Sequence, residues 1–208
     1  MRFLPLALVL NVFPVLAATE LYSWHVFDEI VSLHRKLDLV IHSRVRTREE
    51  FHFLQQVRGG PILRFRPAGR WTVIGGYYFQ PAHDPGREWN RGQRVFGGIE
   101  RALTLKPVNL IGRLALERHI NAGRPSYFRY RSYLRMLIPR GRVSPFIQNE
   151  WLGVRQGFHS VRNSGGLRIQ LSKRVTFEGG YLYDIRRTFW GGDRSAIVTA
   201  IQFRPGER

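Results

Sequence analysis

Apolar and polar residues alternate at every second position over most of this chain. In Tyr127–Ile138, for example, Phe128, Tyr130 and Leu134 alternate with Arg129 and Arg131. Successive side chains of a β-strand point to opposite faces, whereas a helical face recurs every three to four residues. Helical periodicity is hard to find in the sequence. The pattern therefore predicts an all-β protein whose strands each have one apolar and one polar face.

The alternating segments lie along almost the whole chain, and most of them are about ten residues long. They are Leu37–Arg46, Trp71–Gln80, Asn109–Ile120, Tyr127–Ile138, Val143–Leu152, Gly166–Ser172, Val175–Asp184 and Ala196–Arg204. Together with further segments that begin at Leu21–Val31, they make eleven strands at face value.

Two architectures are built from such strands. In a soluble sandwich the apolar faces pack against each other, whereas in a membrane barrel they face the lipid. The polar face consists mostly of Arg, with scattered Glu and Gln, unlike the Lys and Glu mixture of a soluble surface. Aromatic residues gather near segment ends, as in the girdles at membrane interfaces. They are Trp71, Phe79, Phe128, Trp151, Tyr181, Tyr183 and Phe203. These features favour a transmembrane, antiparallel, up-and-down β-barrel.

The expected location of the chain ends limits the number of strands. If both ends of the chain are periplasmic, the number of membrane-crossing strands must be even. Glu50–Arg66 divided at Gly59-Gly60 would give about twelve strands, and a non-spanning Leu21–Val31 would give ten. We prefer twelve, with ten as the alternative.

The connections between segments also alternate in length. Short ones are expected at Pro67–Arg70, Leu105–Val108, Pro139–Arg142 and Ser172–Arg174. Longer polar ones are expected at Pro81–Gly92, Asn121–Ser126, Gly153–Ser160 and Arg186–Asp193. Barrels of the bacterial outer membrane have short periplasmic turns and longer external loops, so the pattern is typical of them.

Residues 1–18 have the features of a secretory signal peptide. Arg2 is followed by an apolar stretch and then by Ala17-Ala18, a small-residue exit after which cleavage is expected. We therefore expect residues 1–18 to be a signal peptide, residues 19–208 to be a single barrel domain, and the bacterial outer membrane to be its location.

The charge of the chain narrows the class of protein further. The chain has 33 Lys and Arg but 15 Asp and Glu, which gives a formal charge of +18, and it has no Cys. The missing Cys excludes disulfide scaffolds and Cys-based zinc sites. No apolar run reaches the roughly 18 residues that a membrane-spanning helix needs. Export argues against nucleic acid as the partner of these basic residues.

If the barrel closes, the polar faces of its strands line a lumen, where Arg side chains need carboxylates or water between them. Arg113, Arg129, Arg131 and Arg135 would repel one another. Glu117 and Glu150 are the first partners we expect, with Glu100 and Glu178 next. The predicted lumen charge cluster is Arg44, Arg113, Glu117, Arg129, Arg131, Arg135, Glu150, Arg168 and Glu178. Such a cluster either fills the barrel with ion pairs or attracts small anions into a narrow passive pore.

The order of several short motifs resembles a known family. These are Leu37–Arg46, Trp71–Tyr78, Arg113–Arg118, Tyr127–Arg135, Asn149-Glu150 and Gly179–Tyr181. In this order they are similar to the bacterial domain-of-unknown-function family 2490, whose members are regarded as outer-membrane β-barrels. The resemblance implies a fold and a location but no reaction. We expect outer-membrane lipid, lipopolysaccharide and the barrel-assembly machinery as partners. Barrel-insertion signals often end in a terminal aromatic residue, whereas here Phe203 is followed by Arg204–Arg208.

Other functions have weaker signals. His42-Ser43 and His159-Ser160 suggest a lipid-modifying enzyme. Adjacent residues on a strand face opposite sides, which argues against cooperation within a pair. Ser160 is expected in a loop and escapes this objection, with Asp184 or Glu178 as its possible partner. The seven His residues are scattered, and His83-Asp84 is the best candidate for a metal site. We expect no metal and no cofactor. External arginines are expected to meet lipid phosphates; they are Arg87, Arg91, Arg124, Arg155, Arg162, Arg187 and Arg194. A lipid-modifying barrel enzyme and an exported soluble basic β-protein remain the alternatives.

Overall fold

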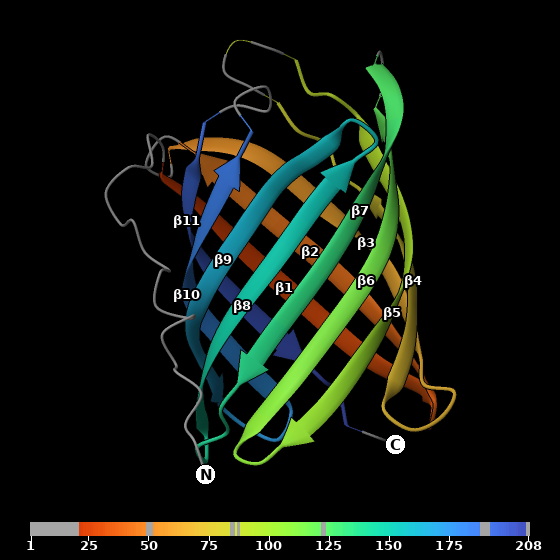
Figure 1. Ribbon diagram of the computed structural model, residues 1–208, viewed down its shortest axis with the longest axis vertical. Coiled ribbons are helices and arrows are strands. Elements are labelled where there is room, and N and C mark those ends of the chain that lie inside the picture. The colour runs from red at the N-terminus through yellow and green to blue at the C-terminus, as the bar shows by residue number, and fades with distance from the viewer. Residues whose placement is uncertain are drawn as a thin grey trace.

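The computed structural model describes residues 21–48, 52–83, 86, 88–121, 124–187 and 192–206, and eleven strands lie within them (Figure 1). They are β1 (Leu21–His34), β2 (Leu37–Arg48), β3 (Phe53–Phe65), β4 (Trp71–Phe79), β5 (Gly92–Leu105), β6 (Val108–Asn121), β7 (Arg124–Leu137), β8 (Val143–Val154), β9 (Gly157–Gln170), β10 (Val175–Arg186) and β11 (Arg194–Phe203). The predicted signal peptide lies outside the described residues.

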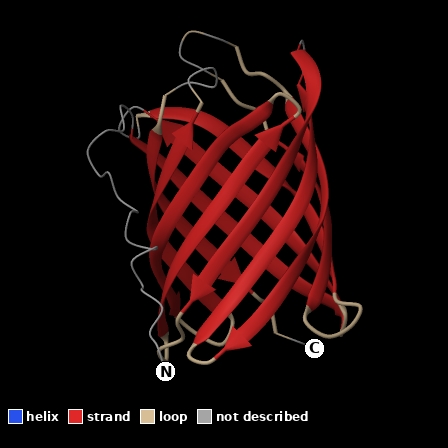
Figure 2. Ribbon diagram, viewed as in Figure 1, coloured by secondary structure: helices blue, strands red, loops and turns tan. Residues whose placement is uncertain are grey.

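The strands form one closed barrel in which each strand pairs with its neighbours in sequence, and β11 closes the ring on β1. Figure 2 shows the tilted strands that make up the wall. All pairs are antiparallel except β1 with β11, which is parallel in register from Leu21 with Ser195 to Glu29 with Phe203. The prediction of an all-β closed barrel is confirmed.

The described residues form eleven strands, so the expected number of about twelve is approximately right. An up-and-down ring with an odd number of strands must close through a parallel pair, and β1 with β11 is that pair. The expected division at Gly59-Gly60 does not occur, since β3 runs unbroken from Phe53 to Phe65. A Cβ at Gly60 would collide with the backbone oxygen of Tyr77, so glycine there permits close approach of β4.

The two ends of the barrel differ less in connection length than predicted. We call the end with the connections 35–36, 66–70, 106–107, 138–142 and 171–174 the turn end. The other, the loop end, has the connections 49–52, 80–91, 122–123, 155–156 and 187–193. The long connections expected at Asn121–Ser126 and Gly153–Ser160 are wrong, because β6, β7, β8 and β9 extend into them.

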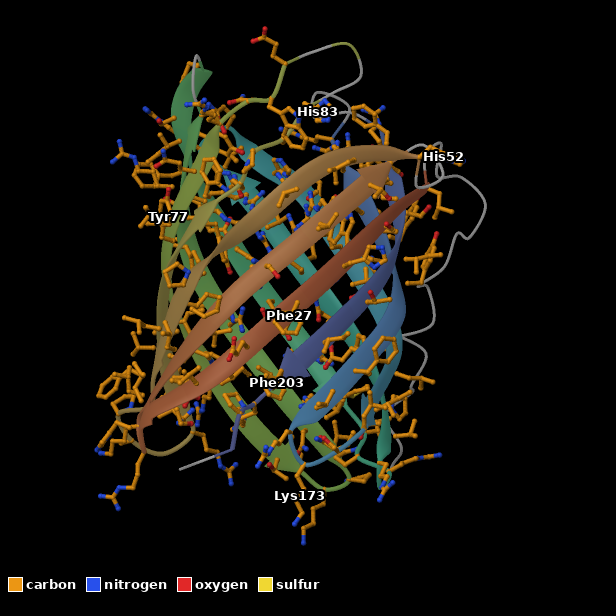
Figure 3. All side chains as sticks on the ribbon, turned by 180° about the vertical axis from the view of Figure 1, so that it is seen from behind. Phe27, His52, Tyr77, His83, Lys173 and Phe203 are labelled. Atoms are coloured by element: carbon orange, nitrogen blue, oxygen red, sulfur yellow. The ribbon has the colours of Figure 1, made fainter. Side chains whose placement is uncertain are left out.

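The outer face of the barrel is apolar, and the alternation in the sequence is the reason. Leu114, Leu116 and Leu134 are exposed, while their neighbours Glu117 and Arg129 are buried inside. Figure 3 shows Phe27, which is also exposed, at mid-height on the outer face of β1. Tyr183 departs from the predicted girdle, because it is only 4% exposed and its hydroxyl donates a hydrogen bond to Asp193.

Apolar residues also fill one sector of the interior. Tyr22 and Trp24 of β1 pack with Leu182 of β10 and with Ala196 and Val198 of β11. Ile30, Val40 and Ile74 are buried apolar residues nearer the other end, and charged and polar side chains occupy much of the interior between these two places. Within the described residues, no helix is long and apolar enough to serve as a membrane span.

Candidate functional site: the buried charge cluster

Glu117 of β6 lies at the centre of the buried charges and is 1% exposed. Arg129 donates to its carboxylate through Nε at 2.8 Å and Nη2 at 2.6 Å, and Arg94 donates through Nη1 at 3.2 Å. Arg131 and His119 lie at 3.4 and 3.2 Å from the same carboxylate. Neighbouring strands β5, β6 and β7 thus bring three guanidinium groups onto one carboxylate, which their cross-strand register allows.

Glu150 of β8 is the second centre. Arg131 donates to its Oε1, and Nη1 of Arg162 lies 3.2 Å from its Oε2. Arg162 also lies 3.2 Å from Asp184 of β10, so the chain of charges continues around the wall. Because Arg131 contacts both Glu117 and Glu150, the two centres form one cluster that spans β5 to β10.

Two further groups hold the other predicted residues. Glu100 accepts from Arg113 at 2.6 Å and from Arg64 at 3.0 Å. Glu178 accepts from Arg135 at 2.8 Å, and Arg168 approaches it to 3.8 Å. Arg113 and Arg135 thus pair with Glu100 and Glu178, the two carboxylates expected after Glu117 and Glu150, because the tilt of the strands aligns them with these groups.

Arg44 is the one predicted residue that the structure places apart from these groups. It is 8% exposed and donates to Gln56 at 2.6 Å, and its guanidinium carbon lies 5.3 Å from the centre of the Trp24 ring. No described carboxylate lies within ion-pair distance of Arg44. Its environment is an aromatic ring and an amide.

Several members of the buried cluster were not predicted from the sequence. Arg94 and Arg58 belong to β5 and β3, which were not among the alternating segments, and Asp184 was named only as a possible partner of Ser160. Arg162 was assigned to an external loop, but it lies inside on β9. The same period-two pattern, continued through β3, β5 and β9, places all three arginines on the inner face.

Two cavities lie inside the barrel among these residues. The loop-end cavity has a volume of about 440 Å³, and nine arginines but only three carboxylates line it. The turn-end cavity has a volume of about 200 Å³ and includes Glu117, Arg113 and Arg64 in its lining. Arg58 and Arg131 line both cavities, so these two side chains lie where the cavities approach each other.

Two histidines besides His119 join the buried contacts. Nδ1 of His42 lies 2.7 Å from Asp28, and its Nε2 accepts from Arg58 at 2.8 Å. Nδ1 of His159 lies 3.1 Å from Oγ of Ser160. The expected loop position of Ser160 is wrong, because Ser160 lies in β9. This strand has an irregularity opposite Leu152 and Gly153, which places both side chains in the interior. Ser160 is 0% exposed, and His159 lines the loop-end cavity.

The predicted external arginines divide into three kinds. Arg91, Arg155 and Arg187 are exposed in connections at the loop end. Arg162 and Arg194 line the loop-end cavity instead, so their external assignment is wrong. For Arg124 the structure describes the backbone at the start of β7, and Arg87 lies outside the described residues.

The candidate metal pair His83-Asp84 is only half described, because Asp84 lies outside the described residues. His83, at the loop end, packs its ring against Phe53 and Trp89, with ring centres 4.5 and 4.1 Å apart (Figure 3). Among the described residues, no group of three or more His, Asp or Glu is placed to hold a metal ion.

An ion pair at the turn end joins β2 to the residue that follows β3. Arg66, which follows β3, donates through Nη2 at 3.0 Å and through Nη1 to the carboxylate of Asp38, and Ser32 donates to the same group at 3.1 Å. The hydrogen bond to Asp38 raises the pKa of Arg66 above its ordinary value. This contact joins the start of β2 to the turn between β3 and β4.

The fold and the interior define a closed β-barrel with an apolar exterior and a charged interior. Residues 22–195 match the family described as "Protein of unknown function (DUF2490)", and the chain belongs to that family. No curated protein matches the sequence. A solved anion-selective porin from Comamonas acidovorans is similar with a TM-score of 0.41 and 12% identity over 82% of this chain and 53% of that one. The chain thus spans about half the length of that porin.

Proposed function

We propose that this protein is a barrel of the bacterial outer membrane whose Arg-rich lumen forms a narrow passive path that favours small anions. The proposal includes export by a signal peptide at residues 1–18, as the sequence indicates. The observation that carries it is the inverted distribution of residues, with leucines and aromatics exposed outside and charges buried inside a closed ring.

The apolar exterior supports membrane insertion. Closure pairs the backbone groups of every strand, which lipid requires because it offers no hydrogen bonds. Exposed side chains such as Leu114, Tyr130 and Trp151 lie on three neighbouring strands, and contact with water there would be unfavourable. Lipid covers such a surface without that cost.

The interior supports a preference for anions. Nine arginines against three carboxylates line the loop-end cavity, so the local charge is positive. Charge of one sign inside low-dielectric walls raises the concentration of the opposite ion. Arg58 and Arg131 line both cavities, so they form the narrowest part of the proposed path. We therefore expect the conductance of the path to be low.

A structural role is the alternative in the same location, and conductance in planar bilayers separates the two. We expect small channel events with a reversal potential of the anion-selective sign in a KCl gradient. Arg58→Gln should reduce the anion preference, whereas Arg118→Gln, an exposed position next to Glu117 on the outer face, should leave it unchanged. No channel events would leave the structural role, and cation preference would refute the anion path.

Location is tested separately from conductance. Washing membranes with carbonate should leave the protein in the pellet, while an exported soluble β-protein would be released.

The exposed Arg91, Arg155 and Arg187 at the loop end are proposed to contact lipopolysaccharide phosphates through charge-assisted hydrogen bonds. Insertion at this location also implies the barrel-assembly machinery as a partner.

The hydrogen bond between His159 and Ser160 is the observation that keeps a lipid-modifying enzyme under test. Lipid mass spectra of cells with the unchanged chain and with His159→Ala should be identical under our proposal. A lipid species that disappears with the substitution would favour the enzyme.

A further inference from the structure

Four arginines follow one another along the inner wall at the loop-end cavity. Arg44 and Arg46 lie on β2, Arg58 on β3 and Arg94 on β5, and all four line that cavity. We call this set the arginine arc. Arg44 and Arg58 are direct cross-strand partners in the register of β2 and β3. Like charges in that position repel each other.

The arc lacks the carboxylates that neutralise the opposite side of the barrel. Among the described residues, no Asp or Glu forms an ion pair with Arg44, Arg46 or Arg58, and Arg94 has Glu117 as its one such partner. The carboxylates of Glu150 and Asp184 lie across the cavity and contact Arg131 and Arg162. Positive charge therefore accumulates on the β2–β5 side.

Aromatic rings hold the arc in place without neutralising it. The guanidinium carbon of Arg46 lies 3.8 Å from the centre of the Trp24 ring. Tyr78 is buried between two members, with Arg58 at 4.5 Å and Arg94 at 4.7 Å from its ring centre. Cation–π contacts orient guanidinium groups but leave their N–H donors free for another partner.

Several of these donors have no partner. The Nε–H groups of Arg44 and Arg46 make no hydrogen bond, and neither do Nε and Nη2 of Arg94. Arg94 is 2% exposed, so two donors of a deeply buried cation are unsatisfied at the edge of a cavity of about 440 Å³. Buried donors without partners are unfavourable, and an acceptor with several oxygens would relieve this.

We propose that the arginine arc is a binding site for a multivalent, phosphate-type oxyanion. This inference deepens the proposed function, because it rests on the same interior and names a class of anion. A phosphate group offers several oxygens to the guanidinium forks of different arginines, which match its geometry. Chloride carries one charge and has no directional acceptor geometry, so it satisfies the arc poorly.

Calorimetric titration of the full chain, folded in a zwitterionic detergent at constant ionic strength, tests the site without reference to conductance. We expect inorganic pyrophosphate to bind saturably with one site per chain and to raise the unfolding temperature, since a ligand that binds the folded state stabilises it. Sodium chloride at equal ionic strength should do neither. Absence of saturable heat with pyrophosphate would overturn the proposal.

Matched variants assign the binding to the arc. Arg44→Gln and Arg94→Gln should each weaken pyrophosphate binding about tenfold or more, which corresponds to about 1.4 kcal/mol. Arg118→Gln removes the same charge from the outer face and should have no effect on affinity. Without anion, Arg44→Gln should unfold at the same or a higher temperature, because it removes the repulsion from Arg58. Equal affinity in all three variants would place the anion elsewhere and refute the site.

Short-chain phosphatidic acid identifies the source of the phosphate. If pyrophosphate binds more tightly than phosphatidic acid, the result favours a free anion as the natural ligand. If phosphatidic acid binds more tightly, the result favours a lipid headgroup. Either result supports the arc as a phosphate site. Saturable binding in a protein that gives no channel events would support this inference while removing the pore. Channel events without saturable binding would do the reverse.

Discussion

Replacing Glu117 by Gln tests whether the buried cluster holds the barrel together. The substitution preserves shape but removes the negative charge on which Arg94, Arg129 and Arg131 converge. At 1% exposure, the carboxylate has little contact with bulk water that could replace its charge. The three guanidinium groups then lose one negative charge that neutralised them, in a region of low dielectric constant.

The expected magnitude follows from these contacts. Removing one partner of a buried ion pair costs roughly 3–5 kcal/mol, because the remaining charge stays buried without compensation. Arg131 keeps Glu150 in this variant, and the amide oxygen of Gln still accepts one hydrogen bond from Arg129. We therefore expect the lower end of that range, about 3 kcal/mol of unfolding free energy.

Urea titration of the barrel folded in detergent, followed by tryptophan fluorescence, measures this difference. Glu88→Gln, on the exposed connection between β4 and β5, is the matched control and should change the free energy by less than about 0.5 kcal/mol. Adding Arg94→Gln to Glu117→Gln should recover about 1 kcal/mol, since it removes one uncompensated cation. A loss below about 0.5 kcal/mol for Glu117→Gln alone would refute the reasoning.

Two further predictions concern the facing of residues and the close approach of strands. Leu116→Arg, on the outer face near the middle of β6, should destabilise the barrel in lipid by roughly 2–4 kcal/mol, measured by urea titration. In the same titration Arg113→Leu should leave folding largely intact, because Glu100 keeps its second arginine; reversed results would mean that the faces are assigned wrongly. Gly98→Val should prevent folding, scored by heat-modifiable gel mobility, because its side chain would collide with the backbone of β6, whereas Gly112→Ala, with open space around it, should fold normally.

The alternation in the sequence predicted which side chains face inward, because the period of a strand is fixed by its geometry. Glu117, Arg129 and Arg131 were assigned to the interior, and the structure buries all or part of each. Leu114 and Leu116 were assigned to the outside and are exposed there. A one-residue error would have reversed every face, so this property is strongly specified.

The pairing of charges could not be predicted in the same way. Arg135 on β7 contacts Glu178 on β10, and Arg64 on β3 contacts Glu100 on β5, so both pairs skip neighbouring strands. Such contacts depend on the tilt and curvature of the closed ring, which no local spacing in the sequence records.

The start of β9, near the loop end, also could not be predicted from the sequence. The first half of this strand contains His159, Ser160, Arg162 and Asn163, and so many polar residues are typical of loops. Inside a barrel a polar residue can face a polar cavity and still belong to a strand. The polar composition therefore predicted a loop where the strand begins, and Arg162 was expected outside.

The arrangement of charge around the ring separates the ion pairs that stabilise the barrel from the arginines that are available to bind an anion. On the β6–β10 side each buried carboxylate is engaged by arginines, so those charges hold one another. On the β2–β5 side Arg44 faces Arg58 with no described carboxylate beside either. Stability alone favours a neutral side chain at one of these positions, because like charges in register are unfavourable. The unpaired arginines of that side, and not the larger cluster around Glu117, are therefore where an anion gains most by binding.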